Sequence, residues 1–204
     1  MDIKKENNSS FSSTLNSIIL SDLLLIETSS NQKVDTLIHI INHASNEANL
    51  APRIEIRAAT NSSVKILEEV RTSNDSIMNH VLRLNCQKNA NIEFYKVIQR
   101  QENSHYLGTQ DIEASENARI KFFLWDFGGD TSKTVTDTKL LGKKSEINYS
   151  ALFTPNKYLH SGNQIKINHE ASHTKSKIKV RGVLNDHSSG VFYGKIKVCL
   201  LYTS

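Results

Sequence analysis

Two cysteines and two closely spaced histidines are the residues of this sequence with the widest chemical range. Cys86 and Cys199 lie far apart in the chain, so they form neither a disulfide framework nor a CxxC metal signature. His169 and His173 have an i, i+4 spacing, which on a helix would place both imidazoles on one face, where they could hold a metal ion. Cys86, His169 and His173 are therefore weak candidates for thiol, cluster or metal chemistry.

The residues around these candidates favour structural roles for them. Cys86 falls on the same face of a period-two segment as Leu84, which predicts a small, buried and unreactive thiol. His169 shares its face with Ile167 and should point inward, where an imidazole needs a hydrogen-bond partner. Strand-like patterns flank His173, so a helix that joins the two histidines is unfavourable. We predict no catalytic, cofactor-binding or metal site in this chain.

Other functional motifs are absent from the sequence. It contains no GxGxxG, P-loop or nucleophile elbow, so nucleotide binding and serine hydrolysis have no support. The formal net charge is +4, without a long run of like charges, which argues against nucleic-acid binding. Five basic residues alternate with apolar ones and are predicted to form one exposed basic face: Lys177, Lys179, Arg181, Lys195 and Lys197.

The elements that must position these residues are short strands. From Pro52 onward the apolar residues alternate with polar ones at period two, which places side chains i, i+2 and i+4 on one face of a strand. Ile92, Ile120 and Ile147 each follow a similar polar turn and are 27 or 28 positions apart, a repeat typical of a solenoid. We predict an all-β fold, a right-handed parallel β-helix, because crossovers between parallel strands are right-handed. A β-sandwich would also give many short strands but needs no repeated length.

The chain divides into three predicted regions. Residues 1–50 should form an N-terminal cap with a short helix and strand, and residues 51–198 the β-helix core. Residues 199–204 match the translation of a transposase end sequence used to prepare sequencing libraries, so we interpret them as an adapter-derived tail; a genuine final strand is the alternative. The sequence is then expected to be a truncated fragment. No signal peptide or membrane span is visible, which favours the cytosol.

The last third of the chain carries a resemblance to a known family. The segment 169–176, HEASHTKS, is similar to the pattern H-x-A-P-x-T-x-S, and 180–198 contains RGVL and GVFYGKIKV. Upstream, Trp125 begins WDFGG, followed by Lys133. In these motifs the chain resembles the SufD-type subunit of the SUF iron–sulfur cluster assembly machinery. The related SufB subunit is the close competitor, but its corresponding segment reads towards Y-R-G. Ser172 replaces the proline of the pattern, and Lys133 stands where arginine is common.

The resemblance implies a function without catalytic turnover. It implies a scaffold subunit that pairs with a SufB-like subunit and is driven by a SufC-type ATPase. The iron–sulfur cluster would belong to the assembled complex, and no cofactor would be bound by this chain alone. The family's C-terminal segment, which docks the ATPase, has no counterpart in the sequence. A β-helix enzyme that acts on polysaccharides and an adhesin-type binding solenoid are the alternatives, and both would normally carry an export signal.

Overall fold

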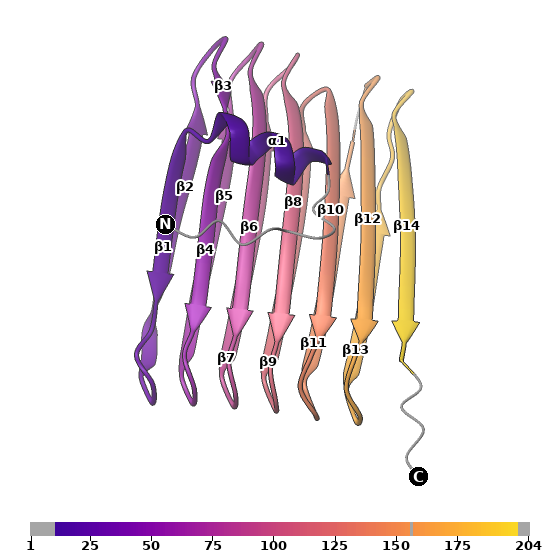
Figure 1. Ribbon diagram of the computed structural model, residues 1–204. Coiled ribbons are helices and arrows are strands. Elements are labelled where there is room, and N and C mark those ends of the chain that lie inside the picture. The colour runs from indigo at the N-terminus through magenta and orange to yellow at the C-terminus, as the bar shows by residue number, and fades with distance from the viewer. Residues whose placement is uncertain (1–10, 156, 200–204) are drawn as a thin grey trace.

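The computed structural model describes residues 11–155 and 157–199, which form two parallel β-sheets stacked face to face (Figure 1). The chain passes from one sheet to the other and back, so that each circuit makes one coil of a solenoid of about six turns. Every strand pairing in both sheets is parallel. The predicted β-helix architecture is confirmed, and its right-handedness remains a prediction.

We call the eight-stranded sheet sheet A and the six-stranded sheet sheet B. Sheet A contains, in spatial order, β1 (Asp22–Glu27), β4 (Pro52–Ala58), β6 (Ile77–Cys86), β8 (His105–Ala114), β10 (Thr131–Leu140), β12 (His160–His169) and β14 (Ser189–Val198), with β3 (Asn49–Leu50) paired to β6. Sheet B contains β2 (Lys33–Ala44), β5 (Ser63–Thr72), β7 (Asn91–Arg100), β9 (Arg119–Gly128), β11 (Glu146–Thr154) and β13 (Lys175–Gly182).

The core consists of rows of like side chains that run along the solenoid axis. Ile92 pairs in register with Ile120, and Ile120 with Ile147, so the predicted stacking of these three residues is confirmed. Beside them, the rings of Phe94 and Phe122 stack with centroids 5.4 Å apart. Because the coils have nearly equal lengths, each apolar side chain falls above its equivalent and buries its surface there.

Asparagines at one corner of the solenoid make the repeated turn possible. Asn31, Asn61, Asn89 and Asn117 all have φ between 56° and 63°, a left-handed conformation that asparagine tolerates better than most residues. Their side chains also form a ladder, in which Asn89 Nδ2 donates to Asn61 Oδ1 at 2.8 Å and Asn117 Nδ2 donates to Asn89 Oδ1 at 2.9 Å. The repeated turn chemistry therefore fixes both the corner and the register.

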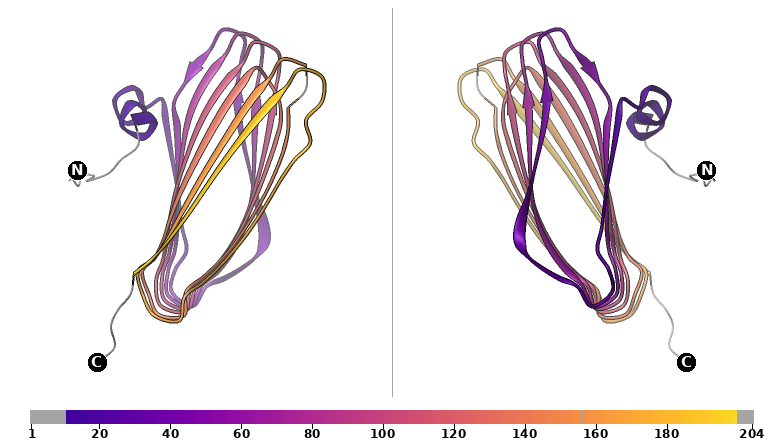
Figure 2. Two further views of the ribbon diagram at one scale, coloured as in Figure 1. Left: turned by 90° about the vertical axis from the view of Figure 1, so that its right-hand side faces the viewer. Right: turned by 90° about the vertical axis from the view of Figure 1, so that its left-hand side faces the viewer.

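The N-terminal segment contributes one helix and the first coil. Helix α1 (Phe11–Ile19) lies outside sheet A, as Figure 2 shows. Strands β1 and β2 then pair with β4 and β5, so the stacking begins at Asp22, ahead of the predicted division at residue 51. Apart from Cys199, the predicted tail at 199–204 lies outside the described residues.

Candidate functional site

Cys86 lies at the end of β6 with its side chain inside the solenoid. It is fully buried, and its register neighbours in sheet A are Ala58 and Ala114. Its Sγ lies 3.9 Å from the carbonyl oxygen of Arg119. Burial raises the pKa of the Cys86 thiol to about 12, so the group is protonated at neutral pH and has little nucleophilic or metal-binding capacity.

His169, the last residue of β12, is held by hydroxyl groups on both sides. Its Nδ1 lies 2.7 Å from Thr174 Oγ1, and its Nε2 lies 2.9 Å from Ser176 Oγ. Thr174 Oγ1 donates to the carbonyl oxygen of Ala171 at 3.1 Å, so it accepts from His169, whose ring proton is then on Nδ1. Nε2 accepts from Ser176. Both ring nitrogens of His169 thus have hydrogen-bond partners, and these bonds stabilise the corner between β12 and β13.

His173 does not form a pair with His169 on a helix. It is an exposed turn residue with φ of 60°, in the corner that leads from β12 to β13. In the described ranges 11–155 and 157–199, no three His, Cys, Asp or Glu side chains are grouped so that they could hold a metal ion.

A buried charged triad that the sequence did not predict lies between the two sheets. Glu68 on β5, His80 on β6 and Lys96 on β7 are each no more than 1% exposed. Lys96 Nζ donates to Glu68 Oε2 at 2.7 Å, and His80 Nε2 lies 2.6 Å from Glu68 Oε1. Lys96 Nζ also lies 3.2 Å from His80 Nδ1. An ammonium can only donate, so the His80 ring proton is on Nε2, where it faces the carboxylate.

The triad favours an ionised carboxylate beside a neutral imidazole. Burial alone would raise the pKa of Glu68, but His80 and Lys96 outweigh it and lower that pKa to about 2. Burial lowers the pKa of His80, although Glu68 opposes this. Burial also lowers the pKa of Lys96, against the opposing effect of Glu68. Asn42 Nδ2 gives Glu68 Oε1 a further hydrogen bond at 2.7 Å.

A second ion pair is buried further along the interior. Arg100 Nε and Nη2 donate to Asp126 Oδ1 at 3.1 and 2.8 Å, and Ser132 Oγ donates to Asp126 Oδ2 at 2.6 Å. Arg100 Nη1 is buried without a hydrogen-bond partner. Gly129 lies against this side chain, and a Cβ at that position would be 2.5 Å from Arg100 Cβ. The motif at 125–129 therefore has a packing role: its glycine leaves room for a buried arginine.

Both interior clusters could have been found from the sequence by their parity. Glu68 lies between Ile66 and Val70 on the inward face, and Lys96 lies between Phe94 and Ile98. A charged residue at an inward position of a regular strand indicates a buried ion pair, because an unpaired charge there would be too costly. Because the triad is buried, it presents no reactive atom to a solute.

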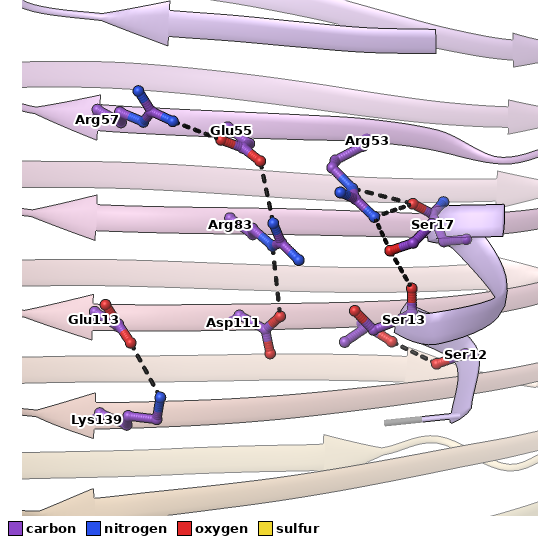
Figure 3. A network of polar contacts seen from close by, with 12 residues as sticks. Ser12, Ser13, Ser17, Arg53, Glu55, Arg57, Arg83, Asp111, Glu113 and Lys139 are labelled. Carbon is purple, nitrogen blue, oxygen red and sulfur yellow. Dashed lines mark hydrogen bonds and ion pairs between the residues drawn. The ribbon is translucent and has the colours of Figure 1, made fainter. Parts of the chain in front are cut away.

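The outer face of sheet A carries a ladder of exposed ion pairs (Figure 3). Glu55 Oε2 lies 3.0 Å from Arg57 Nη2, and Glu55 Oε1 lies 3.3 Å from Arg83 Nη1. Arg83 Nε in turn lies 4.0 Å from Asp111 Oδ2. The two pairs of Arg83 cross from strand to strand, whereas Glu55 and Arg57 both lie on β4. All of them are partly exposed, so each contributes little to stability.

The same face holds α1 through polar contacts (Figure 3). Asn16 Nδ2 donates to the carbonyl oxygens of Asn79 at 2.8 Å and of Pro52 at 3.2 Å. Arg53 Nη2 donates to Asn16 Oδ1 at 3.1 Å and to Ser17 Oγ at 2.7 Å. The helix is therefore attached to the sheet by its polar side.

The five basic residues that were predicted to form an exposed basic face are all exposed, but they do not share one face. Lys177 and Lys179 are exposed on β13 of sheet B, as is Arg181. Lys195 and Lys197 are exposed on β14 of sheet A. Because the outward faces of the two sheets point away from each other, the five residues form two separate groups.

Comparison with known proteins identifies one family. The family model described as "SUF system FeS cluster assembly, SufBD core domain" matches residues 39–199, a range that runs from within β2 to the end of β14. Comparison with curated proteins gives no match. The matched range contains Cys86, His169, both buried charge clusters and almost the whole solenoid.

Proposed function

This chain belongs to the SufB/SufD family of the SUF system for iron–sulfur cluster assembly, and on that premise we propose that it is a SufD-type scaffold subunit without catalytic turnover of its own. Its partners in this proposal are a SufB-like subunit and a SufC-type ATPase, and its compartment is the cytoplasm. The nascent cluster is the cargo of the assembled complex. The GVFYGKIKV segment at 190–198 supports the SufD type over the SufB type.

The state of Cys86 supports the scaffold role most directly. A residue that receives sulfur or binds iron needs an accessible thiolate. Cys86 is instead enclosed between the two sheets, and burial raises its pKa to about 12. The hydroxyl groups around His169 likewise occupy both of its ring nitrogens. These residues stabilise the solenoid rather than offer ligands.

The solenoid itself suits a subunit that holds other proteins in place. A row of stacked aromatic rings connects the coils from β7 to β11, and the asparagine ladder connects those from Asn61 to Asn117. Such a body offers long, fixed outer faces to partners. The described residues contain no helix with the length and hydropathy needed to cross a membrane. A polysaccharide-active or adhesin-type solenoid has no support beyond the shape of the fold.

Reconstitution tests this proposal. The chain would be combined with SufB-like and SufC-type proteins, an iron source and a sulfur donor, and cluster formation would be followed by visible absorbance and circular dichroism. We expect the chain to raise the yield of cluster on the complex while it binds no cluster by itself. A stable cluster on the isolated chain that disappears in Cys86→Ser would contradict the scaffold role, as would an unchanged yield when the chain is omitted.

A further inference from the structure

Helix α1 packs on sheet A with its apolar side facing solvent. Phe11, Leu15 and Ile18 follow the i, i+4, i+7 spacing of one helical stripe. Phe11 is 82% exposed and Ile18 is 75% exposed, and Leu15 between them is half-buried. The opposite side of the helix, with Ser13 and Asn16, is buried against sheet A. An amphipathic surface helix normally buries its apolar stripe, so the reversed mounting leaves this stripe free for another contact.

The outer face of sheet B carries an apolar groove over β2, β5, β7 and β9. Its volume is about 260 Å³, and its lining includes Leu37, Leu67, Tyr95, Val97, Phe123 and Trp125. The rings of Tyr95 and Phe123 stack on each other with centroids 5.0 Å apart. Trp125 is 46% exposed and Leu37 is 48% exposed, so the groove is an open apolar surface of the kind that marks protein contacts.

The chemistry of the groove fits an uncharged helix better than a small molecule. Small-molecule sites place a few polar groups so that they orient the ligand, whereas the exposed surface of this groove is apolar. Lys96 also lines it, but its Nζ is buried on Glu68. Lys121, which is exposed two positions before Phe123 on β9, is already paired with Glu93: its Nζ lies 2.9 Å from Glu93 Oε1. Helix α1 contains no charged residue, so its insertion would desolvate no charge on the helix.

We propose that the groove on sheet B binds the Phe11–Leu15–Ile18 stripe of α1 from a second copy of this chain. Within one molecule α1 lies outside sheet A and the groove lies on the outer face of sheet B, so the two surfaces cannot meet (Figure 2). The contact is an apolar helix in an apolar groove, a common mode of recognition. It joins two different surfaces, so each added copy leaves one free stripe and one free groove.

Three variants test this interface. The stripe variant carries Phe11→Ser and Ile18→Ser, and the groove variant carries Leu37→Ser and Val97→Ser. The control is Val183→Ser, because Val183 is 59% exposed and lies outside both surfaces. Trp125 is the single tryptophan of the chain, so its fluorescence reports directly on the groove. Circular dichroism checks that every variant remains folded.

The wild-type chain and the control should associate as concentration rises, with a shift of Trp125 emission to shorter wavelength. Each double variant alone should remain at the 23.0 kDa monomer mass in sedimentation velocity. The stripe variant keeps its groove and the groove variant keeps its stripe, so their mixture should form a dimer that grows no further. A wild-type chain that stays monomeric, a double variant that associates like the wild type, or a mixture that stays monomeric would each overturn the proposal.

Discussion

At the scale of single residues, the interior of this solenoid contains charged side chains that form ion pairs with one another. Glu68 accepts hydrogen bonds from Lys96 and Asn42 and faces the Nε2 proton of His80. While all three members are present, a buried ionic cluster contributes little more to stability than apolar side chains of similar size would. Removal of one member, however, leaves a buried charge without a partner. Replacement of a single member of the triad should therefore destabilise the coils that contain β5, β6 and β7.

The triad should make stability depend on pH under acidic conditions. The folded-state pKa of Glu68 is lowered to about 2 from an ordinary value of 4.5, so its contribution is complete above pH 5 and is lost as pH falls towards 2. This amounts to about 3 kcal/mol in the free energy of unfolding. The lowered pKa of His80 acts in the same direction from about pH 6.5 downward, since the unfolded state takes up the proton first.

Urea denaturation at a series of pH values measures this effect. Glu68→Gln is the matched variant: it should be less stable at neutral pH by about 3 kcal/mol, because Lys96 loses its counter-charge. Its stability should then change much less than that of the wild type between pH 5 and pH 2. Parallel pH profiles for the two proteins would contradict the prediction, because they would show that folding leaves the pKa of Glu68 unchanged.

Cys86 gives a second prediction at this scale. Cys86→Ala should lower the free energy of unfolding by about 1 kcal/mol, as expected for the loss of a small buried side chain. Cluster assembly by the reconstituted complex should stay nearly unchanged, because the thiol is sealed and protonated. Loss of assembly at unchanged stability would instead identify Cys86 as a functional thiol.

At the scale of elements, the corner asparagines combine two roles that can be separated. Asn89 adopts φ of 56° and exchanges side-chain hydrogen bonds with Asn61 and Asn117. Asn89→Gly removes the hydrogen bonds but keeps the left-handed turn accessible, whereas Asn89→Ala loses both. We expect the alanine variant to be less stable than the glycine variant by about 1 kcal/mol. Urea denaturation of the two variants would show equal stabilities if the turn conformation carried no cost.

The sequence predicted the repeated coils but not the first coil or the interior charges. The repeat is visible because β7 and β9 begin with the same alternation, NIEF in one and RIKF in the other, and have equal lengths. In β1 the run Leu23–Ile26 has no alternation, and β2 shifts register between Lys33 and Leu37. The triad joins β5, β6 and β7 of adjacent coils, so its geometry follows from the register between coils, which a single sequence does not specify. The same holds for the division of the basic residues between two sheets.

At the scale of the whole molecule, stability should depend on position along the solenoid. Each coil contacts only its neighbours, so an internal coil is supported on both sides and an end coil on one. Phe122 is internal: its ring stacks on Phe94 at 5.4 Å and on Tyr149 at 5.2 Å. Ile178 on β13 is only half-buried, and β13 is the last strand of sheet B.

Hydrogen exchange followed by mass spectrometry can test this gradient with one variant at each place. Phe122→Ala should lower stability by about 4 kcal/mol and accelerate exchange in β7, β9 and β11 together, because it breaks the ring stack on both sides. Ile178→Ala removes contacts on one side only, so exchange should accelerate in β13 while β7 and β9 keep their protection. Equal acceleration in every strand for both variants would mean that the solenoid opens as a single unit, and that support from neighbouring coils does not control its stability.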